Sequence, residues 1–439
     1  MRSLIPALCI VWGACAWSYA ESRSFIDITH RTVYEEFSNL AFNYSSAPVN
    51  FGRAWSQTSL GFRVIVDRAE FVAAFASLGA WGAGGGYVSP GVAPSTRTMF
   101  RWENEYPYPD TRFAPWFAEL YTRYTLRWED VPRLGVVNAA VTVGRQRLQF
   151  LDGFVLGDNG IGLDGASITF DLDRYFYFKA FGAKPATDIY HQNRTLMGAL
   201  IGSNYTGEDD FGLDVVVDNN SFTADRRTYM EFYSRKLMRT FHYMLQYAIH
   251  QGSRGDELQY KGQMFCFRAG MRGESSLLGK ANLDFTWLWT SGGDNIEDRF
   301  EPTFARKYDG LNLWGIGEFS AISPAGSFFE YPAGYSGPWV FGFTLTVSPI
   351  ARLIAGLNYY IYDFTYGPET PTAPRPSQVG QLLYARKGHA SEYGFFARFE
   401  VAHQVSVFGS WSFFDPLANL YSPTGDPASK ISVGTEARF

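Results

Sequence analysis

Polar and apolar residues alternate along much of the chain with the period of two that β-strands impose on their side chains. Near the C-terminus, Phe395, Ala397 and Phe399 share one parity, and Arg398 and Glu400 share the other. On this template we find about eighteen such segments, each about ten residues long. The pattern predicts an all-β chain in which every strand has one apolar face and one polar face.

The apolar face of these segments is unusually aromatic. Aromatic residues make up 18% of the chain, and Phe285, Trp287 and Trp289 follow one another on a single parity. A soluble sheet also alternates, but aromatic girdles are typical of strands that face lipid. No run of about eighteen apolar residues follows the N-terminal segment, so no spanning helix is predicted. We therefore predict a transmembrane antiparallel β-barrel of about eighteen strands.

Connections between the predicted strands come in two lengths. Short ones fall at 67–68, 171–174, 347–349 and 402–403, and long ones at 82–115, 185–209, 321–338, 363–392 and 415–430. Barrels of this kind have short periplasmic turns and long external loops. With Phe439 on the periplasmic side, counting strands backwards puts all five long connections outside. Segment 291–310 is long but falls on the periplasmic side, so it is either a plug or gate, or the strand count is off by one there.

The two ends of the chain predict export and membrane insertion. Residues 1–20 have a basic start, an apolar stretch and small residues before Glu21, as a signal peptide does. Residues 21–439 then form a single barrel, which we expect in the bacterial outer membrane. Its last strand alternates from Ile431 to Phe439, and we expect the barrel-insertion machinery to recognise that terminal aromatic. Cys266 is the one cysteine left after the signal, so no internal disulfide forms.

Charged residues of the polar parity cannot face hydrocarbon, where an arginine costs about 2–4 kcal/mol at the midplane. They are therefore predicted to line the lumen. Two interpretations stay open: ladders that brace the wall, or a ring that selects ions. Acids and bases interleave, which argues against a simple anion filter. The predicted pore-lining residues are Arg63, Glu119, Arg123, Arg127, Lys179, Arg235, Arg268, Asp284, Arg352, Arg398 and Glu400.

No catalytic or metal-binding constellation is recognisable in the sequence. His242 and His250 share a strand face, but eight residues of strand at about 3.3 Å each separate them too far for one metal. No Ser/His/Asp arrangement can be placed. A net charge of −5 argues against nucleic-acid binding. We expect no enzyme activity, no cofactor and no metal.

The segment from Val143 through Gly144, Arg145 and Gln146 to Phe150, continuing to Asp164 and Gly165, resembles the alginate-export family of outer-membrane porins. The match to this family's motif covers about twenty-five residues of the chain, namely the end of one predicted strand, a loop and the start of the next strand. The resemblance implies an eighteen-stranded monomeric barrel whose arginine-lined pore guides an anionic polysaccharide. It adds Arg145 to the pore-lining residues. Yet Arg145 has the parity of Ala139, Val141 and Val143, so either a β-bulge turns it inward or it lies at the aqueous rim.

These observations lead to a porin or exporter that passes polar solutes, including anionic or saccharide ones, through a charged lumen. A barrel of about eighteen strands leaves an aqueous channel. The main alternative is a non-transporting structural or adhesive barrel whose lumen is closed by its own side chains. A membrane-embedded enzyme is the third hypothesis. The expected partners are outer-membrane lipid, the insertion machinery and a polar or polysaccharide solute, and the expected state is a monomer.

Overall fold

The computed structural model shows one β-barrel, and most of the wall is described in detail. The described residues are 22–40, 49–82, 113–131, 135–151, 153–157, 162–172, 176–185, 194–204, 209–256, 258–293, 295–300, 302, 336–366, 390–416 and 427–439.

The first half of the wall consists of β1 (Ser22–Leu40), β2 (Val49–Val66), β3 (Ala69–Gly82), β4 (Phe113–Val131), β5 (Gly135–Gln146), β6 (Leu163–Leu172), β7 (Phe176–Pro185), β8 (Arg194–Ser203) and β9 (Asp209–Asn220). The second half consists of β10 (Asp225–Leu237), β11 (Phe241–Arg254), β12 (Leu258–Tyr260), β13 (Gln263–Ser275), β14 (Gly279–Thr290), β15 (Ser336–Ile350), β16 (Leu353–Tyr366), β17 (Ala390–Ala402), β18 (Val405–Pro416) and β19 (Ala428–Arg438). A short 3₁₀ helix, η1 (Ile296–Asp298), lies between β14 and β15.

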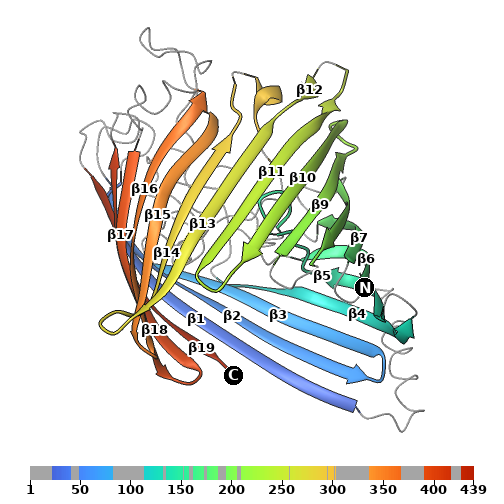
Figure 1. Ribbon diagram of the computed structural model, residues 1–439, viewed down its shortest axis with the longest axis horizontal. Coiled ribbons are helices and arrows are strands. Elements are labelled where there is room, and N and C mark those ends of the chain that lie inside the picture. The colour runs from blue at the N-terminus through green and yellow to red at the C-terminus, as the bar shows by residue number, and fades with distance from the viewer. Residues whose placement is uncertain are drawn as a thin grey trace.

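Each strand pairs in antiparallel fashion with its neighbours in sequence, and β19 pairs with β1 to close the sheet (Figure 1). The short β12 and the longer β13 both pair with β11, so together they make one wall strand. The described residues thus form a closed barrel of eighteen wall strands. The predicted architecture and strand number are confirmed.

The two faces of the wall differ as the alternation predicts. On β19, Ile431 and Val433 are exposed on the outside, while Lys430 and Ser432 are buried inside. The outward face elsewhere carries exposed aromatic side chains, including Phe62, Tyr124, Trp287, Phe341, Phe395 and Trp411. An apolar, aromatic exterior around a polar interior is the arrangement that lipid demands of a barrel.

Register places the short and long connections at opposite ends of the barrel. Turns at 67–68, 276–278, 351–352 and 403–404 lie at the end where β19 finishes, and the long connections lie at the other end. Following the rule for barrels of this kind, we assign the first end to the periplasm. No helix within the described residues is long and apolar enough to cross a membrane.

One predicted connection is wrong. Segment 185–209 is not one long loop, because it contains β8, in which the small residues Gly198, Ala199 and Gly202 weaken the alternation. For segment 291–310, the structure selects one of the two alternatives. Its described residues, 291–293, 295–300 and 302, follow β14 at the external end, because β14 and β15 pair directly. The strand count was therefore off by one in this region, and this error offset the missing β8.

The seam of the barrel includes the last residue of the chain. The amide of Phe439 donates to the carbonyl of Ile28 at 2.8 Å, and the amide of Ile28 donates to the carbonyl of Phe439 at 2.9 Å. The Phe439 side chain is exposed on the outside of the wall. Phe439 therefore completes the hydrogen bonding between β19 and β1 and also presents an aromatic ring to the membrane side.

Deletion of Phe439 is expected to reduce the amount of assembled barrel, because two closing hydrogen bonds and the terminal aromatic are lost together. The measurement is the heat-modifiable band in isolated outer membranes. Phe439→Ala is the matched control, since it keeps the backbone bonds and removes only the ring. Assembly of the deletion at the parental level would contradict an insertion role for the terminal residue.

Cysteine labelling tests the orientation. Phe222 in the β9–β10 turn and Leu277 in the β13–β14 turn are each 82% exposed, and they lie at opposite ends. In a Cys266→Ala background, Phe222→Cys is expected to react with an impermeant maleimide on whole cells. Leu277→Cys is expected to react only after the outer membrane is permeabilised. The opposite pattern would invert our assignment of the two ends.

Candidate functional site

Segment 147–157, which connects β5 and β6, folds into the barrel. The side chains of Leu148, Phe150, Phe154 and Leu156 are fully buried, although the segment lies outside the wall strands. They belong to one apolar cluster with inward-facing side chains such as Phe181 on β7, Val216 on β9, Met264 on β13 and Leu288 on β14. Because these strands stand around the wall, the segment occupies the lumen.

The inserted segment is a tight, internally bonded turn. The amide of Phe150 donates to the carbonyl of Leu156 at 3.0 Å, and the amide of Gly153 donates to the carbonyl of Phe150 at 2.8 Å. Leu151 adopts a φ of 47° and Gly153 a φ of 77°, which reverse the chain. The turn therefore satisfies its own backbone groups while it projects two phenylalanine rings.

Two wall cations face those rings. The Lys179 ammonium on β7 lies 5.8 Å from the centre of the Phe150 ring, and the Arg268 guanidinium on β13 lies 5.3 Å from the centre of the Phe154 ring. Strands β8, β9, β10 and β11 stand between β7 and β13 in the wall. The segment thus reaches across the lumen, held at two places by contacts that contribute about 0.5–2 kcal/mol each.

Most of the other predicted pore-lining residues lie in ion pairs rather than in an open ring. The pairs are Arg63–Glu70 at 3.1 Å, Arg127–Glu129 at 3.2 Å, Arg235–Asp210 at 2.7 Å, Arg398–Glu436 at 3.5 Å and His242–Asp284 at 2.7 Å. A paired arginine contributes little net charge to a passing solute. These pairs therefore favour the ladder interpretation over a selectivity ring for this group.

The remaining predicted residues are spread along the barrel axis. Glu119 and Arg123 lie on the inward parity of β4. Arg352 is in the exposed turn at 351–352, and Glu400 lies 3.8 Å from His403 at the same periplasmic end. Arg123 lies only two residues from the position on β4 that is in register with Lys179, whereas Arg352 and Glu400 lie at the periplasmic end.

Arg145 is not a pore-lining residue in this structure. It stands opposite Leu120 and Asp164 without a register shift, on the parity of the exposed Val141 and Val143. No bulge turns it inward, so of the two alternatives the aqueous rim applies. The Arg145 guanidinium donates to both Asp164 carboxylate oxygens, at 2.7 and 2.8 Å.

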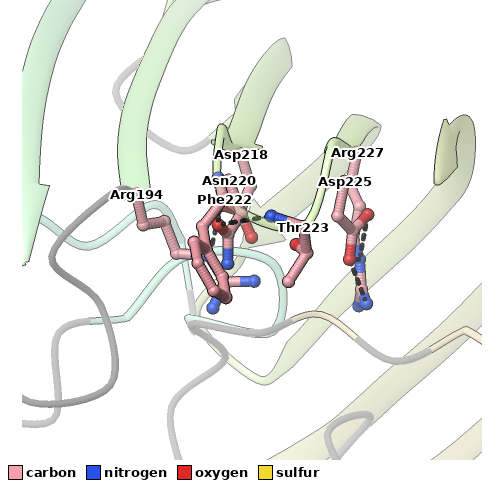
Figure 2. A network of polar contacts seen from close by, with 7 residues as sticks. All are labelled: Arg194, Asp218, Asn220, Phe222, Thr223, Asp225 and Arg227. Carbon is pink, nitrogen blue, oxygen red and sulfur yellow. Dashed lines mark hydrogen bonds and ion pairs between the residues drawn. The ribbon is translucent and has the colours of Figure 1, made fainter. Parts of the chain in front are cut away.

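A polar network lies on the inner wall near the external end, and none of its residues is among the predicted pore-lining residues (Figure 2). Arg194 on β8 and Asp218 on β9 form a buried ion pair at 2.9 Å, and Arg227 and Asp225 on β10 form another at 2.9 Å. The Asn220 side chain accepts hydrogen bonds from the amides of the β9–β10 turn. Arg194 was missed because β8 was read as loop.

A second segment packs against the inner wall close to this network. His250 on β11 stacks between Tyr229 and Tyr260, with ring centres 4.6 and 4.5 Å apart. Phe300, fully buried, meets both Tyr229 and His250 edge-on, and Arg227 lies 4.7 Å from the Tyr260 ring. The described start of the β14–β15 connection is thus fixed inside the external mouth.

Within the described residues, no group of three or more histidine, cysteine, aspartate or glutamate side chains could hold a metal ion. His242 pairs with Asp284, whereas His250 belongs to the aromatic stack, so the two histidines have separate surroundings. Cys266 is a free thiol buried on the inner face.

No family model matches the chain, and no curated protein does. Solved structures do. The outer membrane protein opdK of Pseudomonas aeruginosa aligns with TM-score 0.56 and 7% identity, over 95% of this chain and 98% of that one. OccAB1 of Acinetobacter baumannii aligns with TM-score 0.57 and 9% identity, over 95% and 96%. OccK2 (OpdF) of P. aeruginosa, solved in complex with glucuronate, aligns with TM-score 0.53 and 9% identity, over 95% and 96%.

These similarities show that the chain has the fold of outer-membrane porins. The proteins compared are porins rather than enzymes, in line with the prediction that this chain is not an enzyme. The aligned structures include an outer membrane protein, and the barrel fold with its apolar exterior agrees with the predicted location in the outer membrane. The comparisons do not support the alginate-export family in particular.

Cross-linking tests whether segment 147–157 crosses the lumen. In a Cys266→Ala background, Phe154→Cys combined with Arg268→Cys is expected to react with a short bismaleimide and to change migration of the unfolded chain. Phe154→Cys combined with Arg398→Cys is the control, because Arg398 lies near the periplasmic end of β17. Equal cross-linking in both variants would contradict the inserted position.

Proposed function

We propose that this protein is a porin that lets small polar solutes diffuse across the outer membrane through a lumen narrowed by segment 147–157. The observation that carries the proposal is a closed barrel of eighteen wall strands with a polar interior and an inserted, internally bonded segment. Barrels of this size enclose more space than wall side chains fill. Segment 147–157, anchored across the lumen, narrows the lumen without filling it.

The side chains beside segment 147–157, which narrows the lumen, favour anionic solutes such as sugar acids. Lys179 and Arg268 bring two positive charges to the inserted segment. The charge of arginine is fixed at any working pH, and low-dielectric walls focus the field of such charges on a passing ion. OccK2 (OpdF), a protein of similar fold, was solved with glucuronate. A uronate monosaccharide is therefore the first solute to test, and an anionic polysaccharide of the alginate type is the second.

The mechanism is passive diffusion with partial replacement of the hydration shell by wall groups. A cation next to an aromatic ring offers both a charge for a carboxylate and an apolar surface for the face of a sugar. Ion-paired residues along the rest of the lumen keep the wall polar and rigid without trapping the solute. Conduction requires that the solute binds strongly enough to enter the lumen and weakly enough to leave it.

The competing candidate is a non-transporting structural barrel, and one observation favours it. The apolar cluster around segment 147–157 is buried and joins side chains from many strands, as a closed lumen would. The two functions differ in one measurable property, because a structural barrel does not conduct ions in a planar bilayer.

We expect the purified barrel to form ion-conducting channels. Lys179→Gln combined with Arg268→Gln is expected to move the reversal potential in a salt gradient towards cation selectivity, because two lumen charges are removed. It is also expected to slow uronate uptake in liposome swelling more than uptake of a neutral sugar. Arg226→Gln is the matched control, since Arg226 is an exposed residue on the outward parity of β10.

Arg127→Ala combined with Arg398→Ala provides a second comparison. Both arginines are paired with glutamates and lie towards the periplasmic ends of β4 and β17, away from segment 147–157. We therefore expect a smaller change in reversal potential than for the Lys179/Arg268 variant. An equal or larger change would mean that Lys179 and Arg268, beside segment 147–157, do not set the ion selectivity. Absence of conductance in the parent, even when segment 147–157 is shortened, would overturn the porin and favour the structural barrel.

A further inference from the structure

Two acidic side chains lie next to each other on the inner wall. Asp214 on β9 stands directly opposite Glu231 on β10. Both have the inward parity of the buried Val216 and Tyr229, and both are 0% exposed. Residues directly opposite in an antiparallel pair have Cβ atoms about 4.5–5.5 Å apart. The two carboxyl groups of this Asp214–Glu231 pair can therefore contact one and the same ligand.

The side chains in register with the Asp214–Glu231 pair are apolar. Leu200 on β8 stands opposite Asp214, and Ala248 on β11 stands opposite Glu231. Ala248 belongs to the apolar cluster that contains the buried side chains of segment 147–157, and Leu200 packs against that cluster. Two negative charges buried side by side in such surroundings are costly unless a cation or a proton neutralises them.

The charged side chains that flank the Asp214–Glu231 pair along β9 and β10 bind one another. The pairs are Arg194–Asp218, Arg227–Asp225 and Arg235–Asp210, and Figure 2 shows the first two. Lys179 on β7 lies in the same lateral row as Asp214, but Leu200 stands between them, and its ammonium faces the Phe150 ring. Neither Asp214 carboxylate oxygen has a hydrogen-bond partner among the described residues.

A third polar side chain, Gln246 on β11, is buried beside the pair. Gln246 is 0% exposed, and neither its amide oxygen nor its amide nitrogen has a hydrogen-bond partner among the described residues. It comes two residues before Ala248, which is opposite Glu231, so it occupies the diagonal position that a long side chain reaches. Tyr233, directly opposite Gln246, instead directs its hydroxyl to that of Tyr177 on β7. The amide oxygen of Gln246 is thus available to a ligand of the pair.

We propose that Asp214, Glu231 and Gln246 bind a divalent cation, Ca²⁺, on the inner wall beside the apolar cluster around segment 147–157. The set has two carboxylates and one amide oxygen, which are ligands that hard cations prefer. Ca²⁺ accepts carboxylates in one- or two-oxygen contacts with flexible geometry, whereas Mg²⁺ keeps several waters, for which this buried position has little room. The three ligands come from three strands, so their spacing in the sequence gave no sign of a site.

The test is cation binding by the full-length barrel, refolded in detergent without lipid and treated with EDTA. Added CaCl₂ is expected to raise the temperature at which heat-modifiable migration is lost, because a ligand that binds only the folded state stabilises it. Tb³⁺, which replaces Ca²⁺ at oxygen sites, is expected to show luminescence sensitised by Tyr229 and Tyr233, which flank Glu231 on the inner face of β10. Excess Ca²⁺ is expected to abolish that luminescence.

Asp214→Asn combined with Glu231→Gln keeps the side-chain volumes and is expected to abolish both signals. Gln246→Leu is expected to weaken Ca²⁺ binding several-fold, and Gln246→Glu is expected to strengthen it, because a third carboxylate is added. Glu274→Gln is the matched control, since it removes an exposed carboxylate of β13, and it is expected to bind Ca²⁺ like the parent.

A parent that Ca²⁺ does not stabilise and that gives no Tb³⁺ luminescence would overturn the site. Equal binding by the Asp214/Glu231 variant and the parent would also overturn it, because the ion would then bind elsewhere. If that double variant does not fold, the two Gln246 variants decide, and equal affinity in both would overturn the proposed ligand set. None of these measurements depends on conduction, so they test the cation site separately from the porin.

Discussion

The closure of the backbone hydrogen-bond ladder is the constraint on which the rest of the molecule depends. In hydrocarbon, no water is present to pair an exposed amide or carbonyl, and an open edge strand would leave a whole row of such groups unpaired. Here β19 pairs with β1 over ten residues, from Thr29 opposite Arg438 to Ser38 opposite Ser429. Closing the sheet separates two surfaces, and each side chain is then committed to lipid or to the lumen by its parity alone.

That commitment explains why the lumen holds so many ion pairs. Every charged residue of the inward parity must be accommodated inside, and a buried charge without a partner is costly. The pair Arg194–Asp218 shows the solution, since both side chains are almost completely buried and lie within 2.9 Å of each other. Lys430 and Glu35 form a similar buried pair across the β19–β1 seam, at 3.0 Å. Pairing keeps the inner wall polar while it leaves few charges to act on a solute.

Segment 147–157 is an exception to this polar interior, because it places apolar side chains inside the barrel. Segment 147–157 brings Phe150 and Phe154 into a polar interior, where their rings are fully buried. They are stabilised by apolar contacts with Phe181 and by the cations Lys179 and Arg268. Residues from β7 and β13 are thereby joined across the lumen by one short turn.

The sequence by itself indicated the barrel, because many short alternating segments with an aromatic apolar face are typical of a wall between lipid and water. The apolar exterior and the inward parity of Arg268 and Lys179 follow from this pattern. The strand number agrees with the prediction because the missing β8 and one strand too many offset each other. β8 was missed since Gly198 and Gly202 give no polarity signal, and Arg194 was missed with it. Only the tertiary structure decided which inward charges pair, because pairs such as Arg398–Glu436 join strands through register. It also decided that the segment after Arg145 turns into the lumen and that Arg145 itself stays outside, since contacts across a closed barrel are set by its shape and not by neighbours in the chain.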